Sequence, residues 1–366
     1  MMKHKIITIG FCVILFGLFI ANLVRMPQEE SRTERRKLAT LPPMTVENVF
    51  SGEYMRKFSS YVNDQFVLRE PFRALKAGFD HDILRKWDTN DLFIVNGHYY
   101  KIDYPLKPLK IESAAAKIKK VQQLYLEGLD VYYAIIPDKN YFLEGPYLVL
   151  DYPELERLLC ANLPELTYIR LFDALSVDDY FRTDSHWHQE QLAGVIEALG
   201  QGLGTPLTFA PANYEQQSYE PFYGVYYGQS ARVSQPDTLV WLENETTRQA
   251  EVQMLGGNGQ YGSAPIYQPE LLERMDAYDV FLGGAQPLIH MKNPGNPTGG
   301  KLTIFRDSFT SSLAPLLLEG YAEITLVDLR YISAEQLGNF VDFSDQDILF
   351  LYSASLLNNS DLLMVR

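Results

Sequence analysis

Two short stretches of the chain hold residue types that could perform acyl transfer or hydrolysis. In "FRTDSHWHQE", Asp184 and His186 stand two positions apart. In an extended stretch such residues point to the same side, so the Asp184 carboxylate could accept a hydrogen bond from Nδ1 of His186 and leave Nε2 free as a base. In "IFRDSFTSS", Ser308 is the candidate nucleophile. The alternative for both stretches is that their polar side chains only cap the helices that follow.

A metal site is a further interpretation of the first stretch, with Asp184, His186 and His188 as ligands. His188 falls within the first turn of the predicted helix, however, and helical geometry turns it away from His186. The other histidines have no metal-ligand spacing to these residues: His4, His81, His98 and His290. We therefore predict neither a metal nor a cofactor.

The segment "GNPTGGKL", residues 295–302, resembles the start of a phosphate-binding loop. That motif requires Ser or Thr after its lysine to bind Mg²⁺, and here Leu302 follows Lys301. A phosphate-binding loop also follows a strand and opens a helix, whereas this segment precedes a predicted strand. The sequence therefore favours a turn at a strand entry over a nucleotide site.

Alternating strands and helices must position the candidate residues. From about residue 92 the chain contains short apolar runs typical of strands: "DLFIV", "DVYYAIIP", "KLTIF", "EITLVDL" and "DILFLY". Between them lie helical stretches: "ESAAAKIKKVQQLYLEG", "SSLAPLLLEGY" and "ISAEQLGNFV". This alternation predicts an α/β fold with a parallel sheet, and it places Ser308 just past the carboxyl end of a strand, where ligands bind in open α/β sheets. Residues 204–286, rich in Tyr, Gly, Pro, Gln and Asn, are expected to form a loop-rich excursion over that face.

The N-terminal part of the chain predicts a membrane anchor. Residues 1–5 are basic, and residues 6–24 form an apolar run long enough to cross a bilayer, without a good cleavage site after it. We interpret this run as an uncleaved signal-anchor, a cleaved signal peptide being the alternative. Residues 25–45 are a charged juxtamembrane linker, and residues 46–90 are predicted membrane-proximal helices. Residues 91–366 form the large domain.

One apolar stripe at helical spacing runs through the membrane-proximal segment. Its members recur every four residues and resume after an interruption near Pro71: Phe50, Tyr54, Phe58, Val62, Phe66, Leu75, Phe79 and Ile83.

Charge gives two further expectations. Lys3 and Lys5 precede the apolar run and five basic residues follow it closely, so the positive-inside rule alone would leave the large domain in the cytoplasm. Large domains also cross membranes with little regard to flanking charge, which keeps the opposite orientation open. The formal net charge of −14 repels phosphate backbones and excludes a nucleic-acid partner.

The order of motifs resembles the DHHW family of bacterial membrane-anchored proteins, which is similar to the SGNH-hydrolase-like acetyltransferases of alginate O-acetylation. Asp184-x-His186-Trp187 is followed much later by Asp307-Ser308-Phe309. Further stretches agree in order: "ERRKLATLPP", "YVNDQFVLRE", "IIPDKN", "EPFYGVYYGQSA", "VFLGG", "VDLRY" and "LFLYSASLLN". The resemblance covers nearly all of the chain beyond the anchor. It implies an SGNH-hydrolase-like three-layer fold with a central parallel sheet and a circularly permuted triad order.

Carried over to this sequence, the resemblance makes Ser308 the nucleophile, His186 the base and Asp184 the residue that orients it. Four further residues are expected to contact the substrate or an oxyanion: Lys139, Trp187, Arg306 and Tyr352. The chain departs from the family pattern in having Ser185 where the family name gives a histidine. It also has Arg306 where SGNH hydrolases have a glycine.

The resemblance implies an extracytoplasmic serine O-acetyltransferase that modifies a cell-surface polysaccharide or exopolysaccharide through an acyl-serine intermediate. The implied partners are a membrane-bound O-acyltransferase that supplies acetyl groups and the polysaccharide acceptor. The implied location is the cell membrane, with a single span and the large domain outside. The alternatives are a carbohydrate acetylesterase with the same triad and a non-catalytic, membrane-tethered polysaccharide-binding module.

Overall fold

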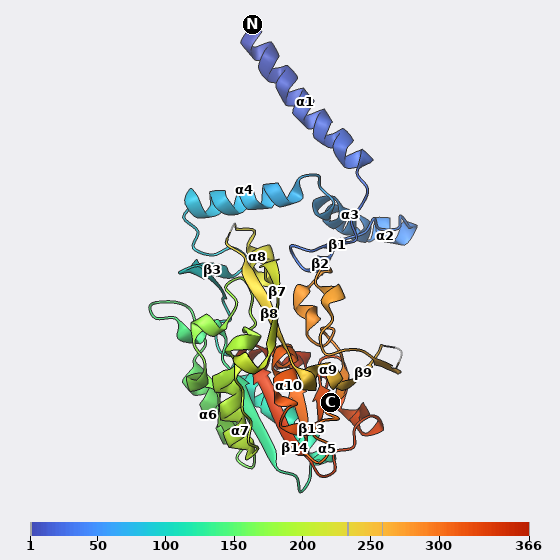
Figure 1. Ribbon diagram of the computed structural model, residues 1–366. Coiled ribbons are helices and arrows are strands. Elements are labelled where there is room, and N and C mark those ends of the chain that lie inside the picture. Colours follow the sequence, from blue (N-terminus) through green and yellow to red (C-terminus); the bar gives the residue numbers. More distant parts are fainter. Residues whose placement is uncertain (1, 233, 258, 366) are drawn as a thin grey trace. The chain divides into compact units, whose positions relative to one another are not determined.

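A computed structural model describes residues 2–232, 234–257 and 259–365 of the chain (Figure 1). Its described residues form two compact units, one of residues 1–90 and 227–234 and one of residues 91–226 and 235–366. We call them the N-terminal unit and the α/β unit.

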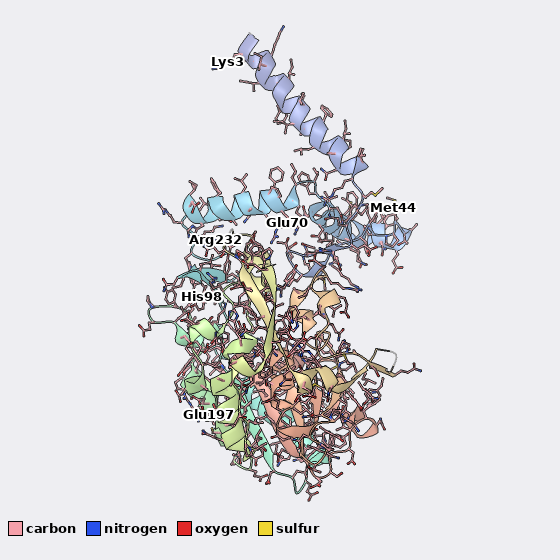
Figure 2. All side chains as sticks on the ribbon, viewed as in Figure 1. Lys3, Met44, Glu70, His98, Glu197 and Arg232 are labelled. Atoms are coloured by element: carbon pink, nitrogen blue, oxygen red, sulfur yellow. The ribbon has the colours of Figure 1, made fainter. Side chains whose placement is uncertain are left out.

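The N-terminal unit begins with helix α1, Met2–Val24, whose side chains from Lys3 onward are mostly exposed (Figure 2). Among the described residues, α1 is the helix that is long and apolar enough to cross a membrane. The predicted linker contains a short antiparallel hairpin of β1, Glu30–Ser31, and β2, Arg36–Lys37.

Most of the apolar stripe predicted over residues 50–83 is divided among three helices of the described chain, and Phe66 and Ile83 lie just outside them. The helices are α2, Val46–Phe50, α3, Glu53–Asp64, and α4, Arg69–Asp82. The breaks lie at Gly52 and Leu68, whose φ angles are +77° and +59°. A right-handed helix cannot continue through a left-handed residue, so the stripe changes direction at each break.

An eight-stranded sheet, counted over the described residues, forms the centre of the α/β unit, in the order β10-β9-β11-β13-β12-β14-β5-β6. The strands are β5 Val131–Ile136, β6 Thr167–Arg170, β9 Glu251–Leu255, β10 Tyr261–Ser263, β11 Leu288–Lys292, β12 Gly300–Arg306, β13 Tyr321–Val327 and β14 Asp347–Ser353. Strands β13, β12, β14, β5 and β6 are parallel. The predicted parallel sheet is therefore confirmed, with β11, β9 and β10 added to it in antiparallel fashion.

Helices cover both faces of this sheet. They are α5 Pro108–Tyr125, α6 Tyr152–Asn162, α7 Ala193–Leu203, α10 Thr310–Leu317 and α11 Ala354–Asn358. Successive residues of β12 point to opposite faces: Ile304 packs in the core with α7 and α10, and Phe305 packs in the core with α5, α6 and α11. The result is the three-layer α/β arrangement that the family resemblance implied.

Two shorter hairpins complete the α/β unit. Strands β3, Leu92–Val95, and β4, His98–Lys101, are joined by Asn96 and Gly97, both with positive φ as a two-residue hairpin turn requires. The excursion predicted at 204–286 contains the hairpin of β7, Glu215–Phe222, and β8, Asp237–Glu243, together with β9 and β10. It also contains the short helices α8, Val225–Ser230, and α9, Glu245–Gln249.

Two helix predictions were wrong in extent. The stretch "ISAEQLGNFV" forms only a 3-10 helix, Ala334–Asn339. The helix expected directly after His186 begins later, at Ala193. The amide of His188 instead donates to the carbonyl of Asp179 at 2.7 Å, which continues a strand-like bridge between Tyr180 and Trp187 and keeps His188 extended.

Candidate active site

Ser308 lies in the tight turn between β12 and α10. Asp307, the residue before it, fixes this turn from the inside: one carboxylate oxygen accepts a hydrogen bond from the amide of Phe309 at 3.2 Å, and the other accepts from the amide of Ser353 at 2.8 Å. Ser353 ends the neighbouring strand β14. The turn that presents Ser308 is thus bound to the adjacent strand end, and Ser308 remains partly exposed.

Asp184 and His186 lie in a short loop whose ends are held together. The amide of Phe181 donates to the carbonyl of His186 at 3.0 Å, inside the Tyr180–Trp187 bridge. Asp237, at the start of β8, accepts from the amide of Thr183 at 2.8 Å and from its hydroxyl at 2.5 Å. The loop is therefore fixed by hydrogen bonds at its base and near its tip.

Ser308, His186 and Asp184 form one chain of hydrogen bonds. The Ser308 Oγ to His186 Nε2 distance is 2.8 Å, and the His186 Nδ1 to Asp184 Oδ1 distance is 2.7 Å. Asp184 is fully buried, and its second carboxylate oxygen accepts from the amide of Val225 at 2.8 Å. Since an ionised carboxylate only accepts, Nδ1 of His186 carries a proton and Nε2 can accept one from Ser308.

Gly224 makes this close approach possible. A Cβ atom at this position would lie 2.3 Å from the carbonyl oxygen of Thr183 and 2.4 Å from Cβ of Asp184. The Gly224 amide also donates to the Thr183 hydroxyl at 2.8 Å. The segment that brings the Val225 amide to Asp184 can pass here only without a side chain.

Tyr278 completes the surroundings of the imidazole. Its ring stacks on His186 with the centroids 3.9 Å apart and the planes within 11°. Its hydroxyl lies 2.9 Å from Oγ of Ser312, in the first turn of α10. The sequence did not indicate Tyr278 or Gly224 as site residues, although Gly224 lies within the stretch "EPFYGVYYGQSA" and Tyr278 stands two residues before "VFLGG".

Trp187 and Arg306, two of the four expected substrate contacts, lie beneath the Ser308 turn. Trp187 is fully buried and its indole N–H donates to the carbonyl of Phe309 at 3.1 Å and to Ser312 at 2.9 Å. Arg306 is buried as well, and Nη1 donates to Oγ of Ser311 at 2.6 Å. Both side chains support the start of α10, so the expectation that they face a substrate was wrong.

Lys139 and Tyr352 are also buried. Lys139 Nζ donates to the carbonyls of Phe181 at 2.8 Å and Arg182 at 3.2 Å, which supports the base of the Asp184 loop. Burial lowers the pKa of Lys139 to about 7, although the charge of Asp184 opposes this shift. Burial likewise raises the pKa of Tyr352. Both residues do lie at the predicted sheet edge, but neither presents a surface to a substrate.

His188 does not join the site. Its ring packs on Phe181 at 4.0 Å between centroids, and its Nδ1 is 3.4 Å from the carboxylate of Glu190. Among residues 2–232, 234–257 and 259–365, no group of three or more His, Cys, Asp or Glu side chains is arranged to hold a metal.

Comparison with known proteins gives matches at the level of structure. No family model matches the sequence, and no curated protein matches it. A DHHW family protein from Eubacterium siraeum superposes with a TM-score of 0.61 at 18% identity, over 75% of this chain and 97% of the other. Bacillus cereus PatB1 with a sulfonyl adduct gives 0.60 at 18% identity, over 75% and 98%.

The O-acetyltransferase domain of Pseudomonas putida AlgJ is more distant, with a TM-score of 0.41 at 13% identity over 68% of this chain and 84% of that one. The first two matches show that this chain has the α/β fold of a DHHW family protein. The fold implied by the sequence resemblance is therefore confirmed.

Proposed function

We propose that the chain is a serine O-acetyltransferase of the cell surface, with Ser308 as nucleophile, His186 as general base and Asp184 as the residue that orients the imidazole. The observation that carries the proposal is the continuous hydrogen-bonded chain from Ser308 Oγ through His186 to the buried Asp184 carboxylate. A nucleophile, its base and an orienting carboxylate within hydrogen-bond reach are the signature of covalent acyl transfer.

In the first half-reaction, Ser308 Oγ attacks the carbonyl carbon of an acetyl donor while its proton passes to His186 Nε2. The resulting imidazolium is stabilised by Asp184, which already accepts the Nδ1 hydrogen bond. The amide of Ser308 has no acceptor among the described residues and can donate to the oxyanion of the tetrahedral intermediate. Collapse expels the donor's leaving group, which takes the proton from His186 and leaves acetyl-Ser308.

In the second half-reaction, a sugar hydroxyl attacks the acetyl carbonyl. Nε2 of His186 accepts the hydroxyl proton and returns it to Ser308 Oγ when the intermediate collapses. The acetyl group then stands on the sugar and the serine is restored. With water in place of the sugar the same residues would act as an acetylesterase, so the acceptor distinguishes the two activities.

The supply of acetyl groups and the location follow from the same proposal. The motif resemblance to alginate O-acetylation proteins favours a membrane-bound O-acyltransferase as donor and a polysaccharide as acceptor. Helix α1 would then anchor the chain in the cell membrane with the α/β unit outside the cytoplasm. Protease digestion of intact spheroplasts tests this orientation: cleavage of the α/β unit supports it, and cleavage only after lysis contradicts it.

The test of the active serine uses the full chain in detergent and a sulfonyl fluoride, a reagent class chosen because PatB1 of the same fold carries a sulfonyl adduct. We expect mass spectrometry to find the label on Ser308, and none on the Ser308→Ala variant. Ser355→Ala is the matched control, because Ser355 is an exposed serine that follows the neighbouring strand β14. Labelling that is unchanged in Ser308→Ala would refute the nucleophile.

A second measurement separates the candidate activities. The chain is incubated with nitrophenyl acetate in the presence and absence of oligosaccharides, and acetylated sugar and free acetate are both measured. Acetylated sugar supports the transferase, and free acetate that is unaffected by sugar indicates an esterase. No turnover and no sulfonyl label would leave a polysaccharide-binding module as the remaining function.

A further inference from the structure

Helix α4 exposes its apolar face and buries its polar one. Leu75 is 69% exposed and Phe79 is 52% exposed, while the residues buried on the opposite side include Ala77 and Asp80. Phe72 and Ile83, at helical spacing from Leu75 and Phe79, are exposed as well. A surface helix in water has the reverse arrangement, with its apolar stripe facing the core.

The inward face of α4 is held by charged contacts. Arg73 Nη2 donates to the carbonyl of Gly228 at 2.7 Å and lies 3.3 Å from Glu34. Arg69 lies 2.5 Å from the same carboxylate. These contacts, made by partly buried side chains, fix the rotation of the helix, so the apolar stripe cannot turn inward without breaking them. Such a fixed apolar surface requires a non-aqueous partner.

The turn that precedes α4 is bonded to the end of the membrane-spanning candidate α1 and to the residue that follows it. The amide of Val67 donates to the Asn22 side chain at 2.9 Å, and Arg25 Nη1 donates to the carbonyl of Phe66 at 2.8 Å. Because α1 ends at Val24, these bonds hold the α3–α4 turn at the point where the chain would leave the apolar layer of a bilayer.

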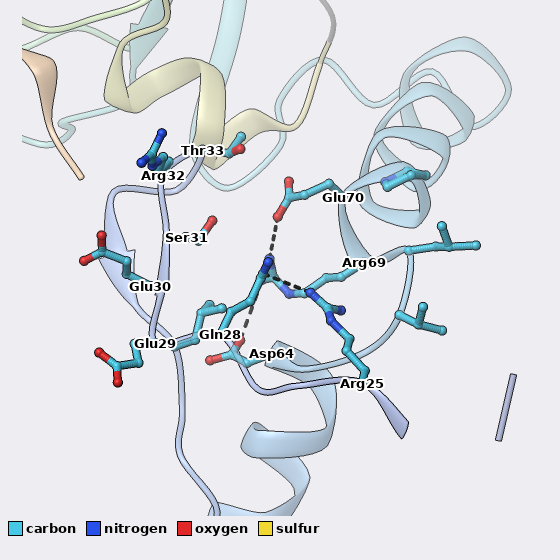
Figure 3. A pocket seen from close by; sticks show the side chains of 14 residues that line it. Arg25, Gln28, Glu29, Glu30, Ser31, Arg32, Thr33, Asp64, Arg69 and Glu70 are labelled. Carbon is cyan, nitrogen blue, oxygen red and sulfur yellow. Dashed lines mark hydrogen bonds and ion pairs between the residues drawn. The ribbon is translucent and has the colours of Figure 1, made fainter. Parts of the chain in front are cut away.

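Polar groups surround the same junction. A cavity of about 610 Å³ opens there, lined by Arg25, Asp64, Arg69 and Glu70 among others (Figure 3). Its mixed charges and ion pairs suit the depth of lipid headgroups and are unsuited to the hydrocarbon layer. At the other end of α4, the exposed sequence Ile-Leu-Arg-Lys-Trp at residues 83–87 combines apolar, basic and aromatic side chains, as is typical at a membrane interface.

We propose that α4 is an interfacial helix, which lies along the membrane surface with Phe72, Leu75 and Phe79 inserted among the lipid acyl chains. The continuity with α1 favours lipid over a protein partner, since the bonds of Asn22 and Arg25 hold the stripe at the bilayer whether or not another protein is present. Basic side chains near the apolar face, such as Arg85, can then reach the headgroups. This role is independent of the proposed chemistry at Ser308.

Tryptophan scanning tests the proposal in the full chain, reconstituted alone into vesicles of phosphatidylcholine and phosphatidylglycerol. Leu75→Trp and Lys76→Trp place an indole at adjacent exposed positions, one inside the apolar stripe and one beside it, each combined with Trp87→Phe. The two other tryptophans, Trp187 and Trp241, are buried in both variants and give the same background. Quenching by lipids brominated on their acyl chains then reports the depth of each new indole.

We expect brominated lipid to quench the Leu75→Trp signal at least about twofold more strongly than the Lys76→Trp signal, with the reverse order for aqueous iodide. Phe79→Trp should behave as Leu75→Trp does and replaces it if that variant does not fold. Equal quenching of stripe and control positions would overturn the proposal. Protection of Leu75→Trp from iodide in native membranes, but not in vesicles that contain this chain and no other protein, would also overturn it, because a protein partner would then cover the stripe.

Discussion

The two units of the molecule bury opposite kinds of side chain. The α/β unit packs two apolar clusters against the faces of its sheet, and its polar chain of Ser308, His186 and Asp184 lies at one edge. The N-terminal unit partly buries paired charged groups such as Glu34 and Arg69 and leaves apolar residues of α4 exposed. Charge follows the same division: residues 1–90 hold 14 Lys and Arg against 10 Asp and Glu, and the remaining 276 residues hold 18 against 36.

This difference shows that the two units are built for different surroundings. An apolar interior with an acidic exterior is suited to water, where net charge keeps a protein soluble. A paired-charge interior with an apolar exterior is suited to a membrane interface, where basic side chains meet headgroups. The effect of a substitution on activity or stability should therefore depend on the unit in which it lies. For the N-terminal unit it should also depend on the lipid present.

The largest expected effect is on chemistry in the α/β unit. Asp184→Asn keeps the size of the side chain but removes the charge that stabilises the imidazolium and selects its tautomer. We expect the rate of acyl transfer to fall by about 10³- to 10⁴-fold, with the fold retained. Steady-state rates and circular dichroism of the full chain check this, with the exposed Asp130→Asn as control. A loss below about tenfold would contradict the role of Asp184.

The next largest effect compares one tryptophan from each unit. Trp187→Ala removes a fully buried ring and leaves the carbonyl of Phe309 without its indole donor, so we expect a loss of about 3–5 kcal/mol in the free energy of unfolding. Trp87→Ala, at an exposed position, should cost less than about 1 kcal/mol in detergent. Urea denaturation measures both, and similar losses would contradict the contrast between the units.

The burial of the Lys139 amine in the α/β unit predicts that the folded chain becomes more stable as the pH rises above 7. Lys139 has a pKa of about 7 in the folded chain because burial disfavours its charge, against an ordinary value of 10.5. Between these values the unfolded chain keeps a proton that the folded chain has lost, so this residue's contribution to stability rises with pH. We expect the melting temperature of the wild type to gain several degrees relative to Lys139→Met between pH 7 and 10. Lys120→Met, at an exposed position, should show no such trend.

Paired charge in the N-terminal unit predicts a smaller effect in acid. The bidentate hydrogen bonds from Arg36 hold the pKa of Asp64 at about 2, below its ordinary 3.8. The stability that this pair contributes is present above about pH 4 and is lost as pH falls through about 2. Asp64→Asn should cost about 1 kcal/mol at pH 7, read from thermal unfolding and proteolysis of residues 25–70. Glu53→Gln, at a half-buried position whose carboxylate pairs with Lys57, should lower the free energy of unfolding by less. An equal loss would show that the Arg36–Asp64 pair contributes no more than an ordinary surface ion pair.

Much of the central fold and the placement of the three polar residues could be predicted from the sequence. The runs that became β12, β13 and β14 are continuous apolar segments separated by helical lengths of chain, which is what a buried parallel sheet requires. Ser308 comes two residues after such a run, so the nearby sequence is enough to predict that it lies at the edge of the sheet. Asp184 and His186 are two residues apart, so their alignment is local as well.

Properties that depend on distant contacts could not be predicted in the same way. Tyr278 reaches His186 across more than ninety residues of chain, and no local pattern marks it. Arg306 ends strand β12, where a charged side chain would be expected to face solvent, but in the folded chain it is buried and donates to Ser311 of α10. The stripe through Leu75 was evident from its spacing, but spacing alone does not say which side of a helix faces the solvent.

Near the Asp184 carboxylate, position 224 has no room for any side chain, so only glycine can occupy it. Since no Cβ fits there, selection for activity should reject every other residue at 224 about as strictly as at Ser308. Inspection of side chains would overlook such a position, because glycine contributes no functional group. Among related chains, a glycine one residue before the amide that binds the aspartate would be as informative a marker of a working site as the serine itself.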